Sequence, residues 1–546
     1  MGWFRSARGL IAHRSRASVT LEVVTSDARL STISTKIILA RVNPMRRRVI
    51  SNVVPGVVLT LAVSLSTVPA FAGRHLSDKT AQKQGVKSQS GSMPVTAASA
   101  KGRELYQKGM EDYENLYLER CNDDWRAAVK EDPSIAVAWA WIAFNSRDPG
   151  EISTARERAK ALVSKITPGE QLMVQWIADV QEGNFIAGIS AMNDMLAMFP
   201  KDKHLLYLAG NWLMGENGNE QAEKLFERAL AIDKNYPAAL NDLAYVYARD
   251  RKFPQAFAAM DRYTLLLPKE PNPQDSYGEI LRMAGNFDGS IKHYSAALKI
   301  DSTFVTSQVG IADTLAVMGN QARARIEYDK AIEQAHNDAD RIDYMMQKAA
   351  SFVRDGNFAE ADKTFDEAAA RAHKQGLDLQ EAVAHQRMAE YQKEDAMALK
   401  HLESAEAALS CRSDLPVIDR DQELARILRH RAVRAAHAGN IGLAGATMKR
   451  LEGMASGSRD LVLQSSFHGA SGALLVAQGK YDEAIAHLEE DEDDPFSMEL
   501  LAKAYYEQGS SEKMHAIEAK LRGTNLPTIE QAIVVPAVRS RKPTIL

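Results

Sequence analysis

Cysteine is nearly absent from this sequence. There are two in 546 residues, Cys121 and Cys411. A count this low excludes a disulfide framework and any metal site built from several cysteines. Because the two lie far apart in the sequence, we expect unpaired thiols, with a single bridge as the open alternative.

A surplus of charge of one sign is also missing. The chain has 67 basic and 71 acidic residues, which gives a formal net charge of −4. Proteins that bind nucleic acid usually carry a basic surplus, so the composition disfavours a nucleic-acid partner.

The usual catalytic motifs are lacking as well: a glycine-rich phosphate loop, a zinc-binding helix with paired histidines and a nucleophile elbow.

Two short stretches hold residue types that could form a reactive or metal-binding site. In "HGASG" at 468–472, we interpret the small residues as the packing face of a helix rather than Ser471 as a nucleophile beside His468. In "EEDEDDP" at 489–495, the carboxylates lack the spacing and glycine of a calcium loop, so we expect a solvated acidic turn. The sequence therefore predicts no enzyme, no cofactor and no metal.

One long apolar run occurs, at 53–68, after Arg46, Arg47 and Arg48 and before "PAFAG" at 69–73. This order is typical of a secretory signal with a small-x-small cleavage site. We predict a signal peptide at 45–72 that is cleaved after Ala72, and hence a periplasmic or secreted protein. An uncleaved inner-membrane anchor is the alternative. Residues 1–44 are then an upstream extension from a misplaced gene start.

Residues 73–101 are rich in Ser, Gln, Lys and Ala, with few large apolar side chains. Such a composition buries too little surface to fold, so we expect a flexible spacer.

Beyond residue 101 the sequence repeats every 34 residues. One position of the repeat is always small, and the position four residues later is always large. The small residues are Gly188, Ala222, Ala256, Ser290 and Ala324, and the large ones are Met192, Phe226, Met260, Tyr294 and Tyr328.

Each unit reads as two amphipathic helices joined by a turn such as "AGN" at 284–286. The pattern resembles the tetratricopeptide repeat, a 34-residue helix–turn–helix. "AVAWAWIAF" at 136–144 and "LAKAYYEQG" at 501–509 read like members of that family. The resemblance implies an all-α fold, a right-handed superhelical solenoid of stacked helix–turn–helix units.

The expected organisation has two arrays. An N-terminal array spans 102–376, an irregular helical connection spans 377–424, and C-terminal units span 425–528. The tail, 529–546, leaves the repeat pattern. Its apolar "AIVVPAV" is expected to lie across the final helices and cap the end of the stack.

In the tetratricopeptide family the first helices of successive units line a concave groove that holds a partner peptide or helix. Mapped through the register, the resemblance implies a groove that runs from apolar through aromatic and amide to charged side chains. The alternative is that these side chains are simply exposed or touch the neighbouring helix. The candidate groove residues are Met173, Ile177, Tyr207, Asn211, Met214, Asn241, Tyr245, Arg249, Glu279 and Arg282. Tyr207 stands where a carboxylate clamp of this family has a lysine, which argues against such a clamp.

Five tryptophans fall within the early units, among them Trp139, Trp141, Trp176 and Trp212. Aromatic residues at regular helical positions are usually core. We interpret Trp139 and Trp176 as core and leave Trp141 and Trp212 open.

The function predicted from the sequence is a non-catalytic interaction scaffold or adaptor of the bacterial cell envelope, with a protein or peptide partner. An accessory subunit of a glycan-processing or export system, or a sensor module of a signalling system, are the alternatives.

Overall fold

The computed structural model describes residues 91–410 and 415–541. These residues belong to one compact unit. The predicted upstream extension, the signal peptide, residues 73–90 of the spacer, Cys411 and residues 542–546 lie outside the described part. In that part no helix is both long and apolar enough to cross a membrane.

The described residues form α-helices and two short 3-10 helices, η1 (Val163–Lys165) and η2 (Glu489–Asp491), without strands. The N-terminal helices are α2 (Ala100–Glu114), α3 (Leu118–Glu131), α4 (Ala136–Asn145), α5 (Pro149–Leu162), α6 (Pro168–Gln181), α7 (Phe185–Met198), α8 (Lys203–Gly215), α9 (Asn219–Ile232), α10 (Pro237–Arg249), α11 (Phe253–Leu266), α12 (Asn272–Met283), α13 (Phe287–Ile300), α14 (Val305–Val317) and α15 (Gln321–Gln334). The others are α16 (Asp338–Arg354), α17 (Phe358–Gln375), α18 (Asp378–Tyr391), α19 (Asp395–Ser410), α20 (Val417–His437), α21 (Ile441–Ser456), α22 (Leu461–Ala477), α23 (Tyr481–Leu488), α24 (Pro495–Glu507), α25 (Ser511–Arg522) and α26 (Ile529–Ser540).

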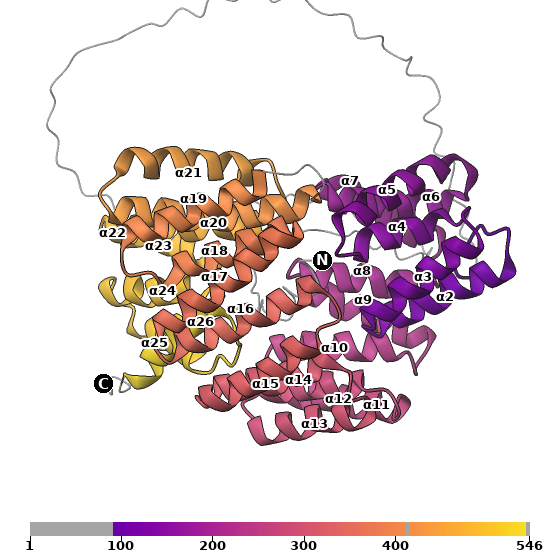
Figure 1. Cartoon of the computed structure of the whole chain (residues 1–546), viewed down its shortest axis with the longest axis horizontal. Coiled ribbons are helices and arrows are strands. Elements are labelled where there is room, and N and C mark those ends of the chain that lie inside the picture. Colours follow the sequence, from indigo (N-terminus) through magenta and orange to yellow (C-terminus); the bar gives the residue numbers. More distant parts are fainter. Residues whose placement is uncertain (1–90, 411–414, 542–546) are drawn as a thin grey trace, which may run out of the picture. The chain divides into compact units, whose positions relative to one another are not determined.

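The helices pair as hairpins, α2 with α3 and so on to α24 with α25, and each hairpin packs on the next (Figure 1). The second helices α7, α9, α11, α13 and α15 begin at 185, 219, 253, 287 and 321, an interval of 34 residues each time. The predicted period and the all-α array of stacked helix–turn–helix units are confirmed.

The turn inside each hairpin explains part of the repeat. Gly183, Asn217, Arg251, Gly285 and Gly319 are spaced by the same interval, and all have positive φ. This left-handed conformation lets the chain leave the first helix and is easiest for glycine. Arg251, at φ 57°, adopts it despite its side chain.

The small and large repeat positions are both buried between packed helices, as expected. Ala222, Ala256 and Ala324 have no exposed surface, and Met192 and Phe226 are equally buried. Close approach is tightest where an aromatic ring of the second helix meets a glycine of a first helix. A Cβ added at Gly310 would lie 2.3 Å from the Tyr294 ring, so no larger residue fits there without movement.

The two tryptophans left open both lie in the core, as Trp176 does, whereas Trp139 does not. Trp141 is completely buried against Trp125, with ring centroids 5.6 Å apart, and Trp212 is also core. Trp139, expected in the core, is half-buried, and its indole N–H donates to the Pro133 carbonyl at 3.0 Å.

The segment 377–424 is more regular than expected. Instead of an irregular connection it contains the complete hairpin α18–α19 and the start of α20. Alanines keep the helices close: Ala382, Ala389, Ala398 and Ala405 are all fully buried.

The end of the expected spacer is packed. The Thr96 hydroxyl and amide donate to the Glu170 carboxylate, both at 2.6 Å, and the Met93 amide donates to Asp202 at 2.7 Å. The polar composition of residues 91–101 therefore serves hydrogen bonds to α6 and α8 rather than a free linker.

The tail does lie across the final helices, since α26 packs on α24 and α25. It also packs on α16 and α18, which lie far earlier in the sequence (Figure 1). Val534 and Val538 reach a cluster with Met498 and Leu521. The tail is thus more than an end cap, because it joins the last hairpin to the middle of the array.

Candidate functional site

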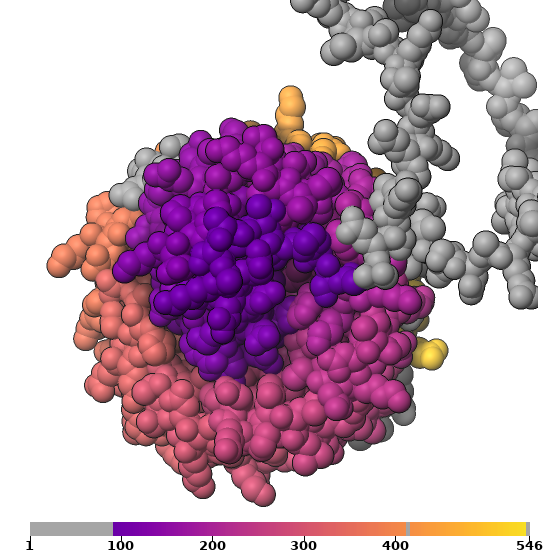
Figure 2. Space-filling view, turned by 90° about the vertical axis from the view of Figure 1, so that its right-hand side faces the viewer, coloured from indigo at the N-terminus to yellow at the C-terminus, as the bar shows by residue number. Residues whose placement is uncertain are grey.

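The first helices of the hairpins surround a cavity of about 800 Å³. Figure 2 shows a hollow beside the indigo N-terminal helices. Residues of α8, α10, α12, α14, α16, α18 and α20 contribute to its wall, as do η2 and the tail.

Six of the predicted groove residues line this cavity: Asn211, Met214, Tyr245, Arg249, Glu279 and Arg282. The other four, Met173, Ile177, Tyr207 and Asn241, are buried in the packing between helices. Tyr207, for example, has no exposed surface, and its hydroxyl donates to the Glu114 carbonyl at 3.3 Å. Whether any of the ten binds a partner stays a prediction.

Asp242, on the cavity wall, accepts hydrogen bonds from two asparagine side chains. Asn211 donates to one oxygen of its carboxylate at 2.7 Å and Asn241 to the other at 3.0 Å. Burial raises the pKa of Asp242 to about 6, although these hydrogen bonds stabilise its charged form.

Beside Asp242, hydrogen bonds from two arginines and a tyrosine hold the charged side chains of the wall in place. Arg249 donates to the Met214 carbonyl at 2.6 Å. Tyr245 and Arg282 both donate to the Glu279 carboxylate, at 2.9 and 3.1 Å. These contacts link side chains of three successive hairpins.

A non-helical stretch directly before the tail, residues 524–528 (the tail segment), lies against this wall. The backbone carbonyl of Asn525 accepts from Arg282 at 2.5 Å, and that of Leu526 accepts from Arg354 at 3.5 Å. The Leu526 side chain is buried in an apolar cluster with residues of α10, α11 and α12. Arginine donors for main-chain carbonyls beside an apolar pocket for one side chain are what an extended peptide requires.

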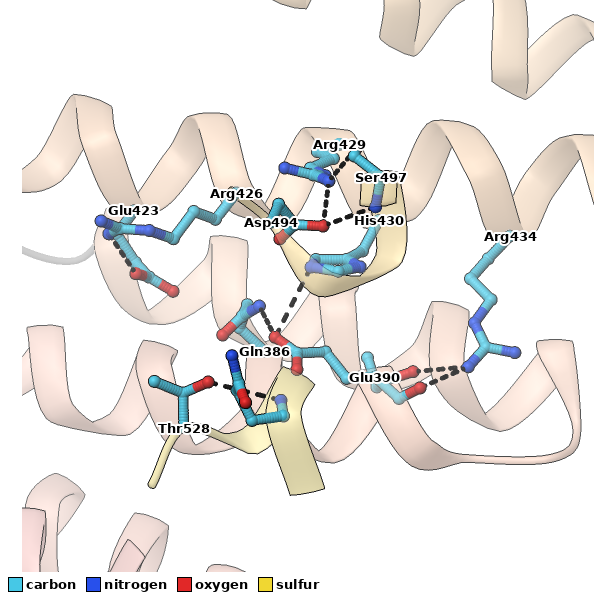
Figure 3. A network of polar contacts seen from close by, with 12 residues as sticks. Gln386, Glu390, Glu423, Arg426, Arg429, His430, Arg434, Asp494, Ser497 and Thr528 are labelled. Carbon is cyan, nitrogen blue, oxygen red and sulfur yellow. Dashed lines mark hydrogen bonds and ion pairs between the residues drawn. The ribbon is translucent and has the colours of Figure 1, made fainter. Parts of the chain in front are cut away.

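A buried polar network forms the C-terminal part of the wall (Figure 3). Arg429 of α20 donates to Asp494 at 2.7 Å and to the Ser497 hydroxyl at 3.0 Å, and it pairs with Asp491 at 2.8 Å. Burial raises the pKa of Asp491 to about 7, against the opposing effect of Arg429. The predicted solvated acidic turn at 489–495 is therefore wrong for Asp491, which is buried and paired.

His430 and Glu390 meet inside the same network, with Nε2 3.5 Å from Oε1 (Figure 3). Burial and the neighbouring arginines lower the pKa of His430 to about 3. Burial also raises the pKa of Glu390, with a further contribution from Glu530 of the tail. Both shifts favour the uncharged forms, as expected for groups removed from water.

The cavity wall is strongly acidic. Among its described residues there are seven arginines and no lysine: Arg120, Arg147, Arg249, Arg282, Arg387, Arg426 and Arg429. Eighteen residues are acidic: Glu119, Asp242, Asp275, Glu279, Asp301, Asp313, Asp340, Asp343, Asp378, Asp419, Glu423, Glu489, Glu490, Asp491, Glu492, Asp493, Asp494 and Glu530. The acidic residues thus exceed the basic ones by eleven, whereas in the whole chain the excess is four.

Sequence reasoning missed the contribution of α20 and of the tail. Arg426 and Arg429 are spaced to share one face of α20, in "DRDQELARILRHRAVRAAH" at 419–437. The spacing of these two arginines indicates that they share a helix face. The 34-residue register cannot be followed through 377–424, so the sequence alone does not place that face on the groove. Leu526 gave no signal, because only the fold brings it to α10–α12.

No protein-family model matches the chain, and no curated protein matches it. Among solved structures, yeast Tom70 is 15% identical, with 81% of this chain and 99% of that chain covered and a TM-score of 0.40. The Cut9–Hcn1 hetero-tetramer of the APC/C is 12% identical, with 74% and 76% covered and a TM-score of 0.36. A tetratricopeptide repeat protein from Parabacteroides merdae is 15% identical, with 50% and 94% covered and a TM-score of 0.33.

Proposed function

We propose that the chain is a non-catalytic scaffold of the bacterial cell envelope that holds an extended segment of a partner protein in its cavity. The observation that carries this proposal is the tail segment 524–528, whose backbone carbonyls are bound by Arg282 and Arg354 while Leu526 fills an apolar pocket. The wall of the cavity thus already binds one stretch of polypeptide in the way that peptide-recognition sites do.

The rest of the cavity supports the same use. Its lining combines aromatic side chains near the N-terminal end, Phe144, Trp176 and Trp212, with polar, charged and apolar side chains from the later helices. A bound segment would lay an apolar residue at one end and polar residues at the other. The export of the protein, by the predicted signal at 45–72, is part of the proposal.

Site-specific photo-crosslinking in the native cell tests this function. A photoreactive amino acid at Thr306, which lines the cavity on α14, is compared with one at Leu265, which is 80% exposed and lies outside the wall. We expect a discrete protein adduct from position 306 and none from position 265. The same adduct from both positions, or none from 306, would contradict binding in the cavity, and a glycan adduct at 306 would favour the accessory-subunit alternative.

A further inference from the structure

The end of α12, Arg354 and the apolar cluster around Leu526 together hold residues 524–528, and we call them the tail-segment site. We propose that this site recognises an extended segment in which an asparagine is followed by an aliphatic residue, and that the tail segment occupies it until such a segment of a partner protein takes its place. This inference rests on the proposed function, because it names where in the cavity the partner binds and which residues its segment carries.

The site contacts the side chain of Asn525 as well as its backbone. The side-chain amide donates to the Met283 carbonyl at 3.3 Å, while the backbone carbonyl accepts from the neighbouring Arg282 at 2.5 Å. Met283 is the last residue of α12, and carbonyls at the end of a helix lack a partner within the helix. An asparagine supplies the donor that this carbonyl requires and keeps its own carbonyl available for the arginine.

The residue after the asparagine provides the apolar contact. The Leu526 side chain is 5% exposed and belongs to the cluster formed by α10, α11 and α12, while its carbonyl accepts from Arg354. Main-chain hydrogen bonds beside a pocket for one side chain are the usual means of binding an extended peptide. All these contacts use a carbonyl, an amide or an aliphatic group, so a segment of another protein with the same two residues can make them.

The tail-segment site is part of the cavity wall. Leu526, Pro527 and Thr528 line the cavity, and so does Arg282. A partner segment in the cavity therefore lies beside the tail segment. The two compete when the partner carries the same pair of residues.

The chain can vacate the site without losing its tail. Residues 524–528 are a non-helical connection between α25 and α26. Other contacts anchor α26, since Ile529 and Ala532 are buried with side chains of α16, α17 and α18. Val534 and Val538 are buried with residues of α24 and α25. Release of the tail segment thus exposes one leucine and leaves the helices on both sides in place.

A tethered occupant lowers the affinity of the partner. A segment joined to its site by short connections has an effective concentration of about millimolar. The apparent affinity for a competing segment falls in proportion to the fraction of chains in which the site is vacant. We therefore expect the wild-type chain to bind the partner segment weakly, and a chain whose tail segment is released to bind it more tightly.

The chain's own sequence supplies the probe. A fluorescent peptide of residues 522–530, RGTNLPTIE, is titrated with the full chain and followed by fluorescence anisotropy. Leu526→Ser removes the apolar group that holds the tail segment, and Asn525→Ala is a milder second variant that removes the bond to Met283. Circular dichroism checks that each variant is folded. We expect the peptide to bind Leu526→Ser at least about tenfold more tightly than the wild type, with a smaller gain for Asn525→Ala.

Three controls test whether the peptide uses this site. Leu415→Ser replaces a leucine that also lines the cavity but packs on a different cluster, so the affinity should stay that of the wild type. Adding Arg282→Gln to Leu526→Ser removes the donor for the asparagine carbonyl and should reverse the gain. A peptide in which the asparagine and the leucine are both replaced by serine should bind none of these proteins.

The inference would be overturned by equal affinity of the peptide for the wild type and both vacated variants, by a gain that survives Arg282→Gln, or by the absence of any binding. These outcomes are distinct from failure of the proposed function. With the photoreactive residue at Thr306, the protein adduct should become stronger in Leu526→Ser. An equally strong adduct in the two proteins would keep the scaffold and reject the competition, whereas no adduct in either and no peptide binding would reject both.

Discussion

Arg282 of α12 donates to the backbone carbonyl of Asn525 at 2.5 Å, although the two residues are 243 positions apart in the chain. The same guanidinium donates to Glu279 and is almost fully buried. One arginine therefore both completes a wall of the cavity and secures the tail against it.

Replacing Arg282 with Gln should loosen residues 524–528 selectively. The variant loses a charge-assisted hydrogen bond, which contributes about 1.5–3 kcal/mol, so amide exchange in this segment should rise roughly tenfold or more. Hydrogen exchange followed by mass spectrometry measures this. Arg262→Gln is the control, since Arg262 also donates to a backbone carbonyl, that of Lys234, but on an exposed face. Equal protection of 524–528 in the Arg282 variant and the wild type would mean that this contact does not hold the tail.

Replacing Gly310 with Ala should destabilise the fold, because the new methyl group overlaps the Tyr294 ring. Overpacking of this kind costs about 1–3 kcal/mol. Thermal melting followed by circular dichroism should show a lower midpoint. Gly445→Ala in α21 is the matched control: its added Cβ meets nothing within 4 Å, so the midpoint should stay or rise. A Gly310 variant as stable as the wild type would contradict the tight contact between α13 and α14.

Replacing Arg251 with Gly should stabilise the protein. Its φ of 57° is left-handed, and Gly285 and Gly319 occupy the equivalent turns. Relief of the left-handed backbone is worth about 1 kcal/mol, partly offset by loss of the guanidinium 5.8 Å above the Phe253 ring. The melting midpoint should rise, and it should rise less for Asn217→Gly, because asparagine tolerates this conformation better than arginine. A lower midpoint for the Arg251 variant would show that its side-chain contacts outweigh the strain.

The stability of the protein should fall as pH rises through the titration of Asp242. Its folded-state pKa is raised from 3.8 to about 6, so the folded chain binds this proton more tightly than the unfolded chain. The resulting stabilisation is complete below pH 4 and is lost by pH 6 to 7. In Asp242→Asn the side chain no longer titrates. The melting midpoint of the wild type should therefore decline relative to that of the variant between pH 4 and 7. Parallel curves over this range would exclude a raised pKa at this carboxylate.

The sequence predicts the repeat well and the site only in part, for a physical reason. Helical periodicity, small and large packing positions and turn glycines are local, so Gly285 or Phe226 could be placed from neighbouring letters alone. Asn211 and Tyr245 could be placed on the cavity wall because they follow the same register. The positions of Tyr207 and Asn241 could not be predicted, because which face of a first helix is covered depends on how its neighbours pack. The contact of Leu526 with α10–α12 depends on the path of the whole chain and leaves no local signature.

The tail also has a consequence for the order in which the protein is made. Helical repeats contact mainly their neighbours and can assemble one after another in chain order. Residues 524–540, by contrast, are synthesised after every helix that they touch, and their contacts with α12, α16 and α18 close large loops of chain. Such long-range contacts form slowly. A nascent chain would therefore pass through a stage in which the hairpins are folded while the tail's place on the wall is still vacant.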